Sequence, residues 1–225
     1  MRGIIQIAGV IDHDEANMFV EEGVDWIGFP LRLTVNREDI SEENAADVIR
    51  SLAPPTRAVL ITYLRTADAI LALCRKLGAA TVQLHGDTPI AEALRLKALK
   101  PDLHVIKSLV VRSGNIEALK GIVRQYAGCV DGFITDTFDP ETGACGATGK
   151  THDWEVSRKL VELSPKPVIL AGGLTPDNVR EAVRDVRPAG VDAHTGVEGP
   201  DGRKDRARIQ RFVSEARAAF SEITR

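Results

Sequence analysis

Short apolar runs alternate with helical patterns along the whole chain, and this alternation limits the possible folds more than any other feature. Eight runs are rich in Val, Ile or Leu, as expected of strands that are buried on both faces. They cover residues 3–9, 24–29, 58–63, 81–84, 104–109, 132–136, 167–171 and 190–193. A helical pattern follows each run, at residues 14–22, 41–52, 66–77, 88–99, 116–126, 153–163, 175–186 and 205–220. The order therefore predicts an α/β fold with a parallel sheet.

Two parallel architectures suit such an order, the closed eightfold barrel and the open doubly wound sheet. Eight complete units within 225 residues favour the barrel, because closure leaves no strand edge exposed. The run at 190–193 is short and is the weakest of the eight predicted strands. The sequence shows no obvious repeat of fixed period, so a solenoid fold is not expected. We therefore predict a single (βα)8 TIM barrel domain over residues 1–225.

Local signals mark several helix ends. Residues 12–15, Asp-His-Asp-Glu, fit a variant of the capping box with Asp in place of Ser or Thr. The same residues could suggest a metal site, but a capped helix start explains them better, and we predict no metal. Pro89 is expected at the first position of its helix, and Gly23 and Gly78 at left-handed helix ends.

Composition excludes several classes of protein. The three cysteines, Cys74, Cys129 and Cys145, are odd in number and scattered, which argues against a disulfide framework or a zinc ribbon. A net charge of -3 gives no electrostatic footprint for nucleic acid. No apolar stretch approaches the roughly 20 residues that cross a bilayer, and the N-terminus lacks a signal-peptide layout. We expect a cytoplasmic protein that binds neither nucleic acid nor membrane.

In a barrel, the chemistry belongs where strands end and helices begin. Gly172 and Gly173 follow the seventh run, and Thr195 and Gly196 follow the eighth. Loops at these two places commonly hold phosphate through bare backbone N–H groups, and glycine lets the anion approach. The alternative is that the glycines only make tight turns.

Two titratable residues end predicted strands. Asp136 closes its buried run, where burial can raise the pKa of the carboxyl and let it deliver a proton. A helix cap or a loop hydrogen bond is the alternative role. His85 follows the run at 81–84 and could contact a ligand or stack structurally. The segment 139–150 ends in Gly-Lys, but its glycine spacing does not fit a P-loop, so we reject nucleotide triphosphate binding.

Six segments are informative when taken together: GVDWIGF (23–29), VQLHGD (82–87), GATGKTHDW (146–154), VILAGGLTPDNV (168–179), GVD (190–192) and TGVE (195–198). Through these segments the sequence resembles the phosphoribosylanthranilate isomerase family of tryptophan biosynthesis over nearly its full length. The resemblance implies a (βα)8 barrel. It also implies an Amadori rearrangement, in which an acid opens the sugar ring of an aminoaldose phosphate and a base removes the C2 proton.

The resemblance further assigns roles to residues. The family's acid maps onto Asp136, and Arg37 has the place of an arginine that contacts the substrate. The implied substrate is a small phosphosugar, bound with help from His85 and the two glycine loops. No cofactor is required, and we expect a monomer or a homodimer.

The family's catalytic base is missing from this chain. Where the family reads Lys-Ile-Cys-Gly, with the cysteine thiolate as base, this chain reads Gln-Ile-Ala-Gly and has Ala8. Alanine cannot accept a proton, and the loss of a general base costs about 10²- to 10⁴-fold in rate. Three interpretations remain open. In the first, another group such as His85 or Cys145 is the base. In the second, the enzyme acts on a different phosphosugar as an isomerase, epimerase or lyase. In the third, the protein binds a phosphosugar without catalysis.

Overall fold

Eight parallel strands close into a barrel in the computed structural model, which describes residues 3–34, 38–137 and 153–224. The strand order is sequential, each strand pairs with the next, and β8 pairs with β1. The strands are β1 (Ile4–Ala8), β2 (Trp26–Pro30), β3 (Arg57–Thr62), β4 (Thr81–Leu84), β5 (His104–Val111), β6 (Gly132–Thr137), β7 (Val168–Leu170) and β8 (Gly190–Ala193). The predicted (βα)8 barrel is confirmed, and the short run at 190–193 does form the closing strand.

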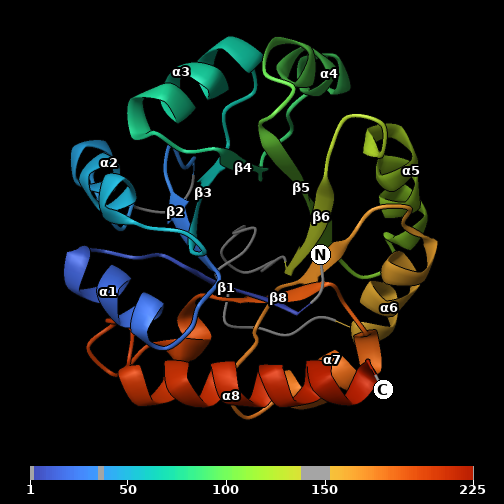
Figure 1. Cartoon of the computed structure of the whole chain (residues 1–225). Coiled ribbons are helices and arrows are strands. Elements are labelled where there is room, and N and C mark those ends of the chain that lie inside the picture. The colour runs from blue at the N-terminus through green and yellow to red at the C-terminus, as the bar shows by residue number, and fades with distance from the viewer. Residues whose placement is uncertain (1–2, 35–37, 138–152, 225) are drawn as a thin grey trace.

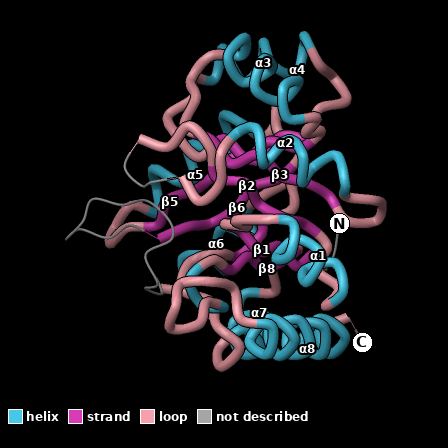
Figure 2. The backbone as a smooth tube through the Cα atoms, turned by 90° about the vertical axis from the view of Figure 1, so that its left-hand side faces the viewer, coloured by secondary structure: helices cyan, strands magenta, loops and turns pink. Residues whose placement is uncertain are grey.

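Within the described ranges, eight helices form a ring around this barrel (Figure 1). They are α1 (His13–Glu21), α2 (Glu42–Ser51), α3 (Ala67–Leu77), α4 (Ile90–Leu99), α5 (Ile116–Tyr126), α6 (Trp154–Leu163), α7 (Val179–Val186) and α8 (Arg206–Ile223), with a short 3₁₀ helix η1 (Thr195–Val197) before α8. In the side view of Figure 2 both chain ends lie at one end of the barrel. That end is the one where strands begin, so the loops from strand to helix gather at the opposite end, the mouth.

Alternation along the strands separates two apolar layers. One set of side chains fills the inside of the barrel and consists of Ala8, Trp26, Val59, Ile61, Ile106, Ile134, Ile169 and Ala171, with Ile4 packed against it. The other set, much larger, lies between strands and helices and includes Phe19, Phe29, Phe133 and Phe212. Because both faces of the sheet are covered, the strands read as continuous apolar runs. Polar residues on the inward face are therefore exceptions that need an explanation.

The helix ends follow the local signals in most cases. The Asp12 side chain accepts a hydrogen bond from Glu15 N at 2.9 Å, and Glu15 Oε2 accepts from Ile11 N at 3.2 Å. Gly78 caps α3 with φ 78°, and Gly23 has φ 79° just after α1. One expectation is wrong: Pro89 lies at the N-cap position before α4 rather than inside the helix.

The helix after β7 also begins later than predicted. The pattern indicated a start at Thr175, whereas α7 begins at Val179. The Asn178 side chain accepts a hydrogen bond from Thr175 N at 2.8 Å and donates one to Gly173 O at 3.0 Å. These bonds hold residues 173–178 as a turn, so the backbone there is not helical.

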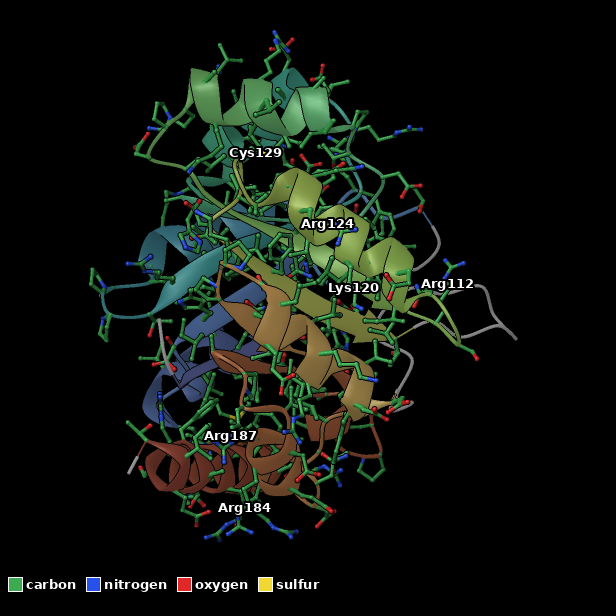
Figure 3. The ribbon with its side chains drawn as sticks, turned by 90° about the vertical axis from the view of Figure 1, so that its right-hand side faces the viewer. Arg112, Lys120, Arg124, Cys129, Arg184 and Arg187 are labelled. Carbon is green, nitrogen blue, oxygen red and sulfur yellow. The ribbon has the colours of Figure 1, made fainter. Side chains whose placement is uncertain are left out.

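Charged side chains cover the outer faces of the helices. Lys120 and Arg124 on α5 and Arg184 on α7 lie on the outside of the ring in Figure 3. Arg184 forms an ion pair with Glu222 of α8 at 2.7 Å. No helix in the described ranges is both long enough and apolar enough to span a bilayer.

Candidate active site

The mouth of the barrel brings together most of the residues singled out from the sequence. Ala8 ends β1, Asp136 lies near the end of β6, and His85 follows β4. The two glycine loops follow β7 and β8. Arg37 and Cys145 lie outside the described residues, so their predicted roles stay predictions.

Asp136 is the central titratable group at the mouth. Burial raises the pKa of its carboxyl to about 7, although the hydrogen bond from Thr137 N to Oδ1, 2.8 Å long, and the charge of His194 oppose the rise. A carboxyl with this pKa carries a proton near neutral pH and can donate it to a substrate. The geometry is compatible with the predicted role as an acid.

His85 lies beside this acid and belongs to a row of buried polar side chains. Its Nδ1 is 3.8 Å from Asp136 Oδ2 and 3.0 Å from Ser108 Oγ, and its ring meets Tyr63 edge-on. The amide of Gln83 donates to Ser108 Oγ at 3.2 Å. This row crosses the inside of the barrel just below the mouth and fixes the histidine ring next to the acid.

Asp192 on β8 is a second carboxyl with a raised pKa, half-buried, that the sequence analysis missed. Burial and the charge of Asp136 together raise its pKa to about 7, although the contact with Gln6 opposes the rise. Two mutually repelling carboxyls hold protons at pH values where exposed aspartates have lost them. The sequence did offer a signal, because Asp192 is the one charged residue within the predicted strand at 190–193.

The two glycine loops touch each other at the mouth. Gly172 and Gly173 have φ values of 108° and 63°, which side chains with a Cβ rarely adopt. A Cβ added to Gly196 would lie 1.8 Å from Leu174 O, so the backbone of η1 packs directly on the turn after β7. Thr195 begins η1. This close approach needs glycine and brings the backbone of both loops to one place.

The position that the family resemblance gives to a thiolate is occupied by a methyl group. Ala8 is buried and its side chain belongs to the inside layer of the barrel. Neither described cysteine lies near it, because Cys74 and Cys129 are buried in the layer between strands and helices. Burial raises the pKa of Cys74 to about 12 and also raises that of Cys129. Neither thiol can supply the missing base.

A second residue that the sequence analysis missed lies next to this gap. His194 follows β8, and its Nε2 would be 2.1 Å from a Cβ added to Gly9, the residue after Ala8. Its Nδ1 lies 3.2 Å from Glu198 Oε1, and its Nε2 lies 3.5 Å from Asp39 Oδ2. Gly190, Asp192 and His194 alternate along the chain, a period-2 signal that predicts one shared face. The imidazole therefore belongs to the mouth.

The described residues contain no group of three or more His, Cys, Asp or Glu side chains placed to hold a metal ion. They do contain two carboxyls with raised pKa values, the imidazoles of His85 and His194, and two contacting glycine loops at the mouth of a closed barrel. This arrangement defines the class of the protein: a (βα)8-barrel enzyme equipped for proton transfer on a small molecule.

The comparison with known families narrows the class. The sequence model of the N-(5'-phosphoribosyl)anthranilate (PRA) isomerase family matches residues 5–215, and the chain belongs to this family. It is 37% identical over 221 residues to N-(5'-phosphoribosyl)anthranilate isomerase 2 of Methanosarcina mazei, with 97% of this chain and 96% of that one covered. The corresponding isomerase of Haloferax volcanii is 36% identical, with 97% and 95% covered.

Solved structures agree with this assignment. Phosphoribosyl anthranilate isomerase from Thermotoga maritima has a TM-score of 0.81 and 30% identity, with 97% of this chain and 100% of that chain covered. A structure of phosphoribosyl anthranilate isomerase in complex with reduced 1-(o-carboxyphenylamino)-1-deoxyribulose 5-phosphate has a TM-score of 0.79 and 28% identity, with the same coverage. The chain is accordingly an isomerase of the class that interconverts aldoses and ketoses.

Proposed function

We propose that this protein catalyses the Amadori rearrangement of N-(5'-phosphoribosyl)anthranilate in tryptophan biosynthesis, with Asp136 as the general acid. The observation that carries the proposal is the buried carboxyl of Asp136 at the end of β6, whose pKa is raised to about 7 by burial. A proton donor of this kind is what opening of the ribose ring requires. Family membership over residues 5–215 supplies the substrate class.

The two glycine loops serve as the phosphate anchor in this proposal. Gly172, Gly173, Thr195 and Gly196 present backbone at one place of the mouth, where N–H groups can surround an anion. Anchoring the phosphate holds the distant ribose carbons above the strand ends, so the acid meets the ring oxygen in a fixed geometry. His85 lies beside Asp136 and is proposed to contact the substrate there.

The chemistry then proceeds by proton transfers alone. Asp136 gives its proton to the ring oxygen as the C1–O bond breaks, and the nitrogen lone pair forms a C1=N double bond. A base next removes the proton from C2, whose electrons form C1=C2 while the C1=N electrons return to nitrogen. The resulting enolamine tautomerises to the aminoketose. Neither an oxidant nor a reductant is consumed, because the oxidation of C2 balances the reduction of C1.

Ala8 favours a second candidate function. An enzyme that lacks the thiolate of its family can retain the phosphate anchor and the acid while acting as an isomerase, epimerase or lyase on another phosphosugar. A protein that only binds a phosphosugar is disfavoured, because a buried carboxyl with a raised pKa has no use in a binder.

A direct assay separates these functions. The purified protein is mixed with phosphoribosylanthranilate, and the loss of substrate fluorescence is followed. The proposal predicts turnover, and it predicts that the same aminosugar without its phosphate is converted far more slowly. No conversion of phosphoribosylanthranilate, together with conversion of another phosphosugar, would establish the second function instead.

A further inference from the structure

The strand register places His194 beside the residue that stands where the family has its thiolate. β1 pairs with β8 so that Gln6 is level with Asp192 and Ile7 with Ala193. Continuing this parallel register by one residue brings Ala8 level with His194. Alternate residues of a strand share one face, so His194 projects to the same side of the sheet as Asp192. The imidazole thus reaches the mouth from the neighbouring strand.

Contacts confirm that the ring lies over the end of β1. His194 Nε2 would be 2.1 Å from a Cβ placed on Gly9, and Gly9 has φ 80°. Any side chain at position 9 would clash with the His194 ring, so only glycine leaves space for it. The exposed fraction of the His194 side chain is 19%, so the ring is packed but still partly open to solvent.

Charged neighbours hold the ring in one orientation. Its Nδ1 lies 3.2 Å from Glu198 Oε1, and Glu198 is in turn paired with the buried Lys204 at 2.5 Å. The Glu198 carboxylate lies close to Nδ1, which has no hydrogen-bond partner among the described residues, and its charge favours a proton on the ring. Asp39 Oδ2 is 3.5 Å from Nε2, longer than a normal hydrogen bond. Nε2 is the ring nitrogen nearest the end of β1, since it faces the backbone of Gly9.

We propose that His194 is the general base of this enzyme and replaces the missing thiolate at position 8. The inference rests on the proposed function. The proton on C2 moves to Nε2, and the C2–H electron pair forms the C1=C2 bond as nitrogen recovers the C1=N electrons. Asp136 remains the acid on the other side of the mouth.

The groups around His194 set the pH at which it can act. Burial lowers its pKa, but the carboxylates of Asp39 and Glu198 outweigh burial and Lys204, and the pKa lies above its ordinary value. Asp136 and Asp192 also face this imidazole and interact with its charge. A base acts only when deprotonated, so the rate should rise with pH as His194 loses its proton. It should fall again as Asp136 loses its own.

The test compares His194→Asn with wild type. Asparagine keeps part of the polar side chain but cannot accept the proton. We expect kcat for phosphoribosylanthranilate to fall by about 10²- to 10⁴-fold and the acidic limb of the pH profile to disappear. Affinity for reduced 1-(o-carboxyphenylamino)-1-deoxyribulose 5-phosphate should remain, which also shows that the site is folded. His13→Asn on the outer helix α1 is the matched control and should leave the rate unchanged.

Two further variants make the outcome decisive. Ala8→Cys in the His194→Asn background should restore turnover, because a thiolate then stands at the family position, and imidazole in the buffer should partly rescue His194→Ala. An active wild type whose rate and pH profile are unchanged in His194→Asn overturns this inference and leaves the proposed function intact. An inactive wild type overturns both.

Discussion

Replacing Asp136 by Asn should stabilise the protein at alkaline pH while it removes the acid. Asp136 ionises with an ordinary pKa of 3.8 in the unfolded chain, whereas burial raises its pKa to about 7 in the folded protein. The folded state therefore holds the proton more tightly, and stability is lost as pH rises from about 4 to about 7. Above that range both states are ionised and the penalty is constant.

The size of the penalty follows from the same two values. The difference between 3.8 and about 7 corresponds to a penalty of at most about 4 kcal/mol above pH 8 and less than about 1 kcal/mol at pH 4. An Asn side chain is neutral at every pH, so the variant does not have this ionisation penalty. Its side-chain oxygen can still accept the hydrogen bond that Thr137 N gives to Asp136 Oδ1 at 2.8 Å. The stability advantage of Asp136→Asn should therefore grow with pH.

Urea unfolding of both proteins at pH 4, 6 and 8 measures this directly. Asp185→Asn, an exposed position on α7, is the control and should change stability by less than about 0.5 kcal/mol at each pH. The reasoning is refuted if Asp136→Asn is equally stable or less stable than wild type at pH 8, or if its advantage is independent of pH.

Three further predictions follow. Ala8→Cys in otherwise wild-type protein should raise kcat for phosphoribosylanthranilate measurably in the fluorescence assay, and a lower rate would contradict the mapping of position 8. Gly196→Ala should cost about 1–3 kcal/mol in urea unfolding and weaken phosphosugar binding, because its Cβ would lie 1.8 Å from Leu174 O, whereas Gly121→Ala on α5 meets nothing and should not destabilise. The pKa of Glu198 is lowered to about 2 because its contacts with His194 and Lys204 outweigh burial. Its contribution to stability, at most about 3 kcal/mol and reduced by solvent screening, is lost as pH falls from about 5 to 2. Glu198→Gln should therefore be less stable than wild type at pH 7 and similar to it near pH 2, and a difference that persists at low pH would refute the assignment.

The fold was predictable from the sequence because every strand is covered on both faces. Continuous apolar runs and the capped helices between them define eight units, and even the short β8 was found. Helix starts were less predictable. Pro89 and Thr175 were expected inside helices, but the side chain of Asn178 holds a turn through two hydrogen bonds, which composition does not reveal.

The site was predictable only where a motif or a strand end marked it. Asp136 and His85 were identified in this way, and the structure brings them within 3.8 Å of each other. Asp192 and His194 were missed because their importance depends on strand pairing between β8 and β1, at opposite ends of the chain. Their alternate spacing was visible, but the short strand gave it little weight.

The central claim is that this barrel converts phosphoribosylanthranilate with Asp136 as the acid. The most direct test is kcat of wild type and of Asp136→Asn on that substrate at pH 7, with binding of the reduced product analogue measured in both. The account predicts turnover by wild type, a loss of about 10²- to 10⁴-fold in the variant, and retained binding. An inactive wild type, or an Asp136→Asn variant that turns over as fast as wild type, would contradict it.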